Sequence, residues 1–288
     1  MGFGSLKEIL AVCAEKNISF SEAVLTDDIS ERGVSKEESL NEMRRLWSYM
    51  KQAAENYDRN DRSASGLSGG DGGKMRDRVE KGSLAGSFMG KVIASALEMG
   101  ECNACMKRIV AAPTAGSCGV LPAVMINCIS EYGGEEEELL KALYVAAGIG
   151  QVIAERASIA GATGGCQAEV GTAAAMAAGA VVSLNGGDGE MICHAAAMAL
   201  KNLMGLVCDP VGGLVEVPCV KRNVIGAINA IAAADMALAG IKSRIEPDDV
   251  IDAMKDVGDK MHSSLKETGE GGVAGTHSAQ LQIEKMKF

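Results

Sequence analysis

The sequence predicts an all-α fold, and three observations favour this class. Hydrophobic alternation and β-branched clusters, the marks of strands, are almost absent from the 288 residues. Several long stretches are instead rich in alanine, a strong helix former. Aromatic residues make up only 3% of a chain that is 47% hydrophobic, so the core must be built from Ala, Val, Ile, Leu and sixteen Met residues. Such small or unbranched side chains suit close packing of helices.

The N-terminal part of the chain predicts two helices and then a long loop. A capping box formed by Ser35 and Glu38 starts a long amphipathic helix that runs to about Tyr57. The segment 58–75 is rich in Ser, Gly and Asp and is expected to be a loop. Helical periodicity returns over 83–99. The apolar face of an earlier short helix consists of Leu6, Ile9, Leu10 and Cys13.

The rest of the chain predicts further helices separated by turns rich in glycine and proline. The segment 112–124 is a turn that leads into an apolar stretch, and Pro247 lies near a helix start, followed by two acidic residues that suit the helix dipole. The tail from Thr268 is expected to be irregular. Residues 1–60 are interpreted as an N-terminal helical segment and 61–288 as the main domain, continuous with it. The helices expected in between cover 139–161, 168–184, 191–206 and 223–241.

Charge and cysteine content exclude several classes of protein. The net charge of −10 argues against non-specific binding of nucleic acid, which needs a basic surface. Nine cysteines fit no compact disulfide framework, and the first residues do not resemble a signal peptide. Apolar stretches are interrupted before they reach the length of a membrane span, so no membrane partner is expected. We therefore expect a cytoplasmic protein with reduced thiols.

Three chemical motifs are weak on inspection. The stretch 69–75 resembles a phosphate-binding loop, but Ser68 stands where that motif needs glycine, and Met75 replaces the magnesium-binding hydroxyl residue. The three histidines are scattered, which disfavours a histidine-based zinc site. Cys102 and Cys105 have the spacing of a zinc or redox pair, but no second pair follows them.

Four loops remain, over 63–71, 113–119, 164–171 and 208–223, and three of them carry cysteine. Small residues allow backbone N–H groups to approach a ligand closely, although most such loops are ordinary surface turns. Polar or turn-forming residues flank Cys166, Cys208 and Cys219, whereas Cys13 and Cys128 sit in apolar helical patterns. Soft thiolates suit zinc or an iron–sulfur cluster, so these three cysteines form a candidate metal site.

Three segments also carry a resemblance to a known family. The stretches GLVCDPVGGLVEVPCVKRN (205–223), GGCQAEVGTAAAMAAG (164–179) and APTAGSCGVLPAV (112–124) resemble the iron–sulfur-dependent L-serine dehydratases, and specifically the α subunit of the two-subunit form. The resemblance extends from about Ser63 to the end of the chain. It implies a helical catalytic domain over 61–288. It also implies a [4Fe–4S] cluster on Cys166, Cys208 and Cys219, and conversion of L-serine to pyruvate and ammonia without pyridoxal phosphate.

The resemblance also implies a chemical role for having only three cysteine ligands. Three thiolates bind three irons of the cluster, and the fourth iron, without a protein ligand, acts as a Lewis acid on the serine hydroxyl. The family also contains a smaller domain that this chain lacks, which implies a separate β subunit. We expect Gln167 or Glu169 to hydrogen-bond the cluster or the substrate, although Glu169 could equally be a carboxylate that suits the dipole at a helix start. We expect Cys118 to be structural. Lys91 is the predicted general base, with Lys81 and Lys221 as alternatives. The residues expected to bind the serine carboxylate lie in two loops, Ser65 and Ser68 in one and Thr114 and Ser117 in the other.

Other readings stay open at this point. The same chemistry could act on another hydroxy-amino acid or hydroxy acid, because one methyl group changes specificity by only about 1–3 kcal/mol. The chain could instead be a non-catalytic iron–sulfur or zinc protein that senses redox state or transfers electrons. A pyridoxal-phosphate enzyme is disfavoured because the expected strands are missing.

Overall fold

A computed structural model describes residues 2–286, and their backbone forms helices without any strand. Within this range, a single isolated bridge between Cys208 and Lys266 is the only β-type pairing. The all-α class is therefore confirmed.

The α-helices are α1 (Leu6–Lys16), α2 (Phe20–Arg32), α3 (Lys36–Glu55), α4 (Asp71–Glu80), α5 (Gly86–Ala104), α6 (Val120–Tyr132), α7 (Glu136–Arg156), α8 (Gly161–Gly164), α9 (Thr172–Leu184), α10 (Gly189–Lys201), α11 (Cys219–Leu238), α12 (Pro247–Lys260) and α13 (His277–Ile283). Shorter turns of helix are η1 (Ala115–Ser117), η2 (Gln167–Gly171, π-helical), η3 (Val211–Gly213) and η4 (Ser263–Leu265).

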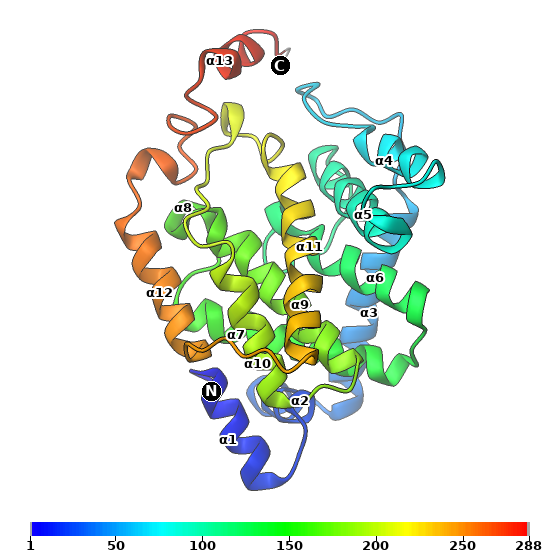
Figure 1. The fold of residues 1–288 in the computed structure, drawn as a ribbon, viewed down its shortest axis with the longest axis vertical. Helices are drawn as coiled ribbons and strands as arrows, with labels where there is room; N and C mark the ends of the chain where they lie inside the picture. The colour runs from blue at the N-terminus through cyan, green and yellow to red at the C-terminus, as the bar shows by residue number, and fades with distance from the viewer. Residues whose placement is uncertain (1, 287–288) are drawn as a thin grey trace.

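Helix α9 lies at the centre of the bundle and packs against α6, α7, α10 and α11 (Figure 1). Its sequence, TAAAMAAGAVVSL, is almost entirely small and apolar, which lets four neighbouring helices approach closely. The window 167–184 is long and apolar enough to cross a membrane by composition, but 83% of it is buried inside the fold. This stretch therefore serves as the core helix of the bundle.

The N-terminal helices pack onto the same core as the rest of the chain. Ser35 and Glu38 form the expected capping box at the start of α3. Side chains from α1, α2 and α3, among them Leu6, Phe20 and Trp47, belong to one hydrophobic cluster with those of α7 and α9. Residues 1–60 thus share their core with the main domain, and the boundary near residue 60 stays a prediction.

Two expected irregular segments contain helices. The segment 58–75 was expected to be a loop throughout, but α4 begins at Asp71 in spite of two following glycines. The buried carboxylate of Glu101 accepts hydrogen bonds from the N–H groups of Asp71 (2.7 Å) and Gly72 (3.2 Å), and so supplies the cap from α5. The tail is also not irregular throughout, because Thr276 caps the short helix α13.

Candidate metal and substrate site

Cys166 lies where a glycine turn meets a turn of π-helix. Gly165 has a φ of 78°, and a side-chain carbon there would lie 2.8 Å from the Leu206 carbonyl oxygen. Only glycine meets both demands, so the residue before Cys166 is fixed by backbone packing. Cys166 then precedes η2, and π-helical turns of this kind occur frequently at functional sites.

Gln167 joins the Cys166 turn to the loop that leads into Cys208. Its backbone N–H donates to Leu206 O (2.9 Å), and its side-chain oxygen accepts from Gly205 N (2.8 Å). Its side-chain nitrogen donates to Met254 O on α12 (2.9 Å). The buried amide therefore bonds to backbone on both sides, and it holds two loops in register.

Two of the predicted cysteines meet in the fold together with an acid. The sulfur atoms of Cys166 and Cys208 and a carboxylate oxygen of Glu169 all lie within 4.8 Å of one another. Both cysteines are buried, each about 2% exposed. Among the residues that the structure describes, this is the one group of its kind in which three or more such ligands converge.

The third predicted cysteine, Cys219, lies at the first residue of α11 and is also buried. Its sulfur is outside the group of atoms within 4.8 Å. Burial raises the pKa of the Cys219 thiol to about 12, and the nearby charge of Cys166 adds to the shift. The structure thus brings Cys166 and Cys208 together and leaves Cys219 as a neighbour of the pair.

Arg222 is the cation of this site. Its guanidinium donates to the Cys166 sulfur (3.3 Å) and to Val207 O (2.7 Å), and it forms an ion pair with the buried Asp209 (2.8 Å). A hydrogen bond from Cys208 is the main cause that lowers the pKa of Cys166, and the Arg222 charge lowers it further. The same hydrogen bond raises the pKa of Cys208. Of the two thiols, Cys166 therefore loses its proton more readily, and the thiolate is the form that binds metals.

The Glu169 carboxylate occupies a space lined by glycine. A side-chain carbon at Gly161 would lie 2.9 Å from both the Cys208 sulfur and a Glu169 oxygen, and one at Gly116 would lie 3.4 Å from both oxygens. Burial raises the pKa of Glu169, and a hydrogen bond from Thr114 partly offsets the shift. This carboxylate is the acid–base group nearest to the thiols among the predicted site residues.

The two hydroxyl-bearing loops differ in what they contact. The hydroxyls of Thr114 and Ser117 lie 3.1 Å apart, and Thr114 reaches Glu169. Asn223 fixes this loop to α11, because its amide accepts from Gly119 N (2.8 Å) and donates to Gly116 O (2.9 Å). The Thr114–Ser117 loop therefore lies at the site.

The other loop, around Ser65 and Ser68, is bound to a buried acid that sequence analysis did not single out. Ser63 and Ser65 donate their hydroxyl protons to the carboxylate of Glu216, at 2.6 and 2.8 Å. Glu216 lies three residues before Cys219 in the chain. The loop is thus attached to the segment that leads into α11.

The structure does not bring the predicted base to the thiols. Lys91 is partly exposed on α5 and pairs with Glu131 of α6 (3.3 Å). Glu131 is near the far end of α6, on the order of 16 Å along the helix from its start beside the site. Lys221 is 69% exposed and pairs with Asp71, and Lys81 caps the outer end of α4. These lysines are solvated, so their amines are poorly suited to act as bases.

Sequence analysis thus missed four polar residues of the site: Arg222, Asp209, Asn223 and Glu216. All four lie within the stretch 208–223 that carries two of the cysteines. The available signal was that charged residues stand close to cysteines in that stretch, which is unusual for packed thiols.

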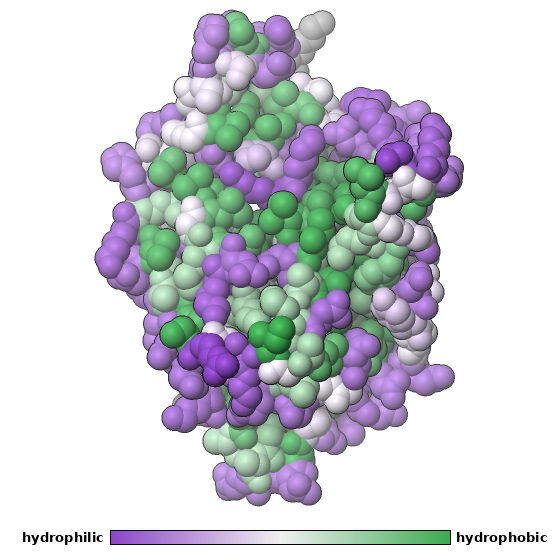
Figure 2. All heavy atoms as spheres, in the orientation of Figure 1, coloured by the Kyte–Doolittle hydropathy of each residue, from purple (hydrophilic) through white to green (hydrophobic). Residues whose placement is uncertain are grey.

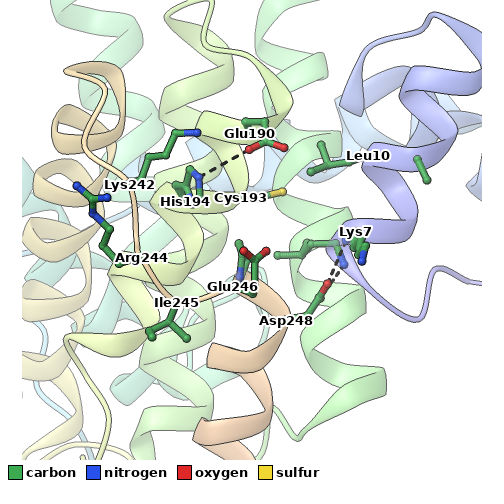
Figure 3. A pocket seen from close by; sticks show the side chains of 13 residues that line it. Lys7, Leu10, Glu190, Cys193, His194, Lys242, Arg244, Ile245, Glu246 and Asp248 are labelled. Carbon is green, nitrogen blue, oxygen red and sulfur yellow. Dashed lines mark hydrogen bonds and ion pairs between the residues drawn. The ribbon is translucent and has the colours of Figure 1, made fainter.

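A cavity of about 540 Å³ lies elsewhere, between α1, α10 and the start of α12 (Figure 3). None of the predicted site residues lines it. Two of its acids serve local structure, since Asp248 accepts from the first N–H groups of α1 and Glu190 faces His194 (3.8 Å). This cavity is therefore separate from the residues that sequence analysis selected.

Comparison with known proteins identifies the family of the chain. Residues 15–274 match the family model of the serine dehydratase alpha chain. A probable L-serine dehydratase alpha chain from Bacillus subtilis (strain 168) is 44% identical over 287 residues, covering 99% of this chain and 95% of the relative. The L-serine dehydratase alpha chain of Peptoniphilus asaccharolyticus is 40% identical over 276 residues, covering 95% and 94%. An L-serine dehydratase from Mycobacterium tuberculosis is 36% identical over 287 residues, which are 94% of this chain but 60% of that longer relative. The chain belongs to the serine dehydratase alpha chain family.

Proposed function

We propose that the chain is the catalytic α subunit of an L-serine dehydratase that holds a [4Fe–4S] cluster and converts L-serine to pyruvate and ammonia. The convergence of the Cys166 and Cys208 sulfurs with the Glu169 carboxylate carries this proposal. The relatives named as L-serine dehydratases supply the substrate.

The residues present fit such a cluster. Thiolate sulfur is the usual ligand of iron–sulfur clusters, and Cys166, Cys208 and Cys219 are buried near one another without a disulfide. Arg222 offsets part of the negative charge that thiolates gather, and glycine at position 161 leaves space beside the Cys208 sulfur. When bound, a cluster with three protein ligands supplies a Lewis-acidic iron that makes a hydroxyl a better leaving group.

The protein's own residues would divide the remaining work. Glu169 takes the place of Lys91 as the group that accepts the α-proton, because its carboxylate is the acid–base group beside the thiols and burial raises its pKa. Thr114 and Ser117 offer hydroxyls for the substrate carboxylate. Burial of the thiols keeps water away from the reacting groups. Loss of water from serine leaves aminoacrylate, which rearranges to an imine and hydrolyses to pyruvate and ammonia.

A separate β subunit is part of the proposal. The L-serine dehydratase of Mycobacterium tuberculosis is considerably longer than this chain, and two relatives of similar length are named alpha chains. Figure 2 shows apolar side chains exposed on one face of the molecule, where a partner could pack. Nine free thiols suit the reducing cytoplasm as the place of action.

Anaerobic purification tests the function directly. The expected protein is brown, contains about four irons and four sulfides for each chain, and forms pyruvate from L-serine when it is assembled with its partner. Air should bleach it and stop turnover, and ferrous iron under reducing conditions should restore both. A brown protein that turns over threonine or a hydroxy acid but not serine would support the other substrate class. An inert brown protein would support a redox sensor, and a colourless zinc protein would refute the proposal.

A further inference from the structure

Glu216 is a buried carboxylate for which the proposed reaction has so far no use. It is 7% exposed, and within the described residues no Lys, Arg or His nitrogen pairs with it inside 4.0 Å. Its two oxygens instead accept one hydroxyl proton each, from Ser63 at 2.6 Å and Ser65 at 2.8 Å. A buried carboxylate needs hydrogen-bond partners, and both of its oxygens find them in the loop that carries Ser63 and Ser65.

The contacts of these two serines show what the carboxylate does to the loop. Each hydroxyl has one proton, and giving it to Glu216 leaves the oxygen lone pairs free to accept. Ser63 Oγ then accepts from Ser68 N (3.2 Å), and Ser65 Oγ accepts from Leu67 N (3.1 Å). Ser63 N also donates to Ser68 O (3.0 Å), which closes the loop 63–68. The Glu216 carboxylate therefore orients the hydroxyls that fold this loop.

The loop held in this way has free donors. Among the described residues, no internal hydrogen bond takes up the N–H groups of Ala64 and Ser65. Successive N–H groups of a tight loop form a concavity that binds anionic oxygens. The segment that carries Glu216 also borders the site, because a side-chain carbon at Gly116 would lie 3.4 Å from both Val215 and Glu169.

We propose that Glu216 is a positioning residue that holds the Ser63–Ser68 loop in the shape that binds the carboxylate of the substrate. This inference rests on the proposed serine dehydratase function. It assigns Ser65 a role through its backbone N–H, because its hydroxyl is already bound to Glu216. Glu216 itself does not touch the substrate in this arrangement, and it acts through the loop.

The test compares Glu216→Gln with Glu190→Gln, a control on the exposed start of α10. A glutamine would donate from one side-chain atom, so one serine could no longer give its proton there, and the loop would lose its closed form. In the anaerobic enzyme with its partner, we expect Glu216→Gln to raise the KM for L-serine about tenfold and to change kcat less. The inhibition constant of D-glycerate, which shares the carboxylate and lacks the ammonium group, should rise by a similar factor. Iron content and visible spectrum should equal those of the parent enzyme.

Several outcomes would overturn the inference. These are an unchanged KM, a loss of iron in proportion to activity, or a weaker affinity for serine with an unchanged affinity for glycerate. If Glu216→Gln does not fold, Ser65→Ala replaces it as the test. This variant removes one of the two hydroxyls, so it should weaken the binding of both serine and glycerate by a smaller factor. Failure of the proposed function would be distinct, since the parent enzyme would then lack turnover or cluster.

Discussion

Two pairs of cysteines in this molecule each contain a buried thiol, but they differ in spacing along the chain, in hydrogen bonds and in the pKa of their thiols. Cys102 and Cys105 stand three positions apart at the end of α5, whereas Cys166 and Cys208 come from distant segments that the fold brings together. The Cys102 thiol points to the carbonyl oxygen of Ala53 at 3.5 Å, and burial raises its pKa to about 11. The pKa of Cys166 is instead lowered by its hydrogen bonds with Cys208 and Arg222.

The difference shows that sequence spacing is a poor guide to a thiol site in a helical protein. The Cys102 pair has a familiar spacing but no third ligand, and no arginine donates to either sulfur within the described structure. The Cys166 pair has a carboxylate, a guanidinium and space provided by glycine. The hydrogen bonds that the Cys166 sulfur receives from Cys208 and Arg222, rather than spacing, distinguish the two pairs.

The largest expected effect comes from removing one sulfur of the distant pair. Cys208→Ser should abolish both iron binding and serine turnover, because the hard hydroxyl is a poor replacement for a thiolate. Iron and sulfide analysis and a pyruvate assay under anaerobic conditions would measure the effect. The matched variant Cys102→Ser should keep its iron. Equal iron contents in the two variants would remove the basis for the assigned ligands.

The second-largest effect is expected from Glu169, whose loss should affect the reaction but not the binding of iron. Glu169→Gln should lower kcat by a factor of about 100 to 10,000, the usual contribution of a general base, while the iron content stays near that of the parent. Lys91→Gln is the control, since its ion pair with Glu131 is exposed, and it should change kcat by less than about twofold. A large loss in Lys91→Gln with none in Glu169→Gln would reverse the roles proposed for them.

These contrasts explain what sequence analysis could and could not reach. The helix α3 was predictable because its cap, Ser35 with Glu38, is local. The start of α4 was missed because its cap, Glu101, comes from another helix. The cysteines of the site could be selected by their polar neighbours, but the contact of Arg222 with Cys166 depends on tertiary packing. The choice of Lys91 as base went by residue type alone, which does not indicate where a side chain lies.

A smaller effect concerns the cation beside Cys166. Arg222→Lys keeps the charge but loses the planar fork that serves Cys166, Val207 and Asp209 together. We expect the cluster to be retained about 10-fold to 100-fold less tightly, as is common when a partner of a metal ligand is lost. The rate of iron release to a chelator measures this. A matched change of a surface arginine, Arg45→Lys, should leave that rate unaltered. If Arg222→Lys releases iron at the parent rate, the guanidinium does not support the thiolate.

The smallest effect is expected from the pair with the familiar spacing. The double variant Cys102→Ala and Cys105→Ala should keep iron content and kcat within about twofold, because burial raises the pKa of both thiols in spite of the nearby Lys107 charge. The free energy of unfolding should fall by about 1 kcal/mol, since the buried Cys102 side chain and its hydrogen bond to the Ala53 carbonyl oxygen are lost. Denaturant unfolding and anaerobic iron analysis measure the two quantities separately. Loss of iron in this variant would mean that the segment at the end of α5 takes part in metal binding, and that hydrogen bonds to the sulfur are not what separates the two pairs.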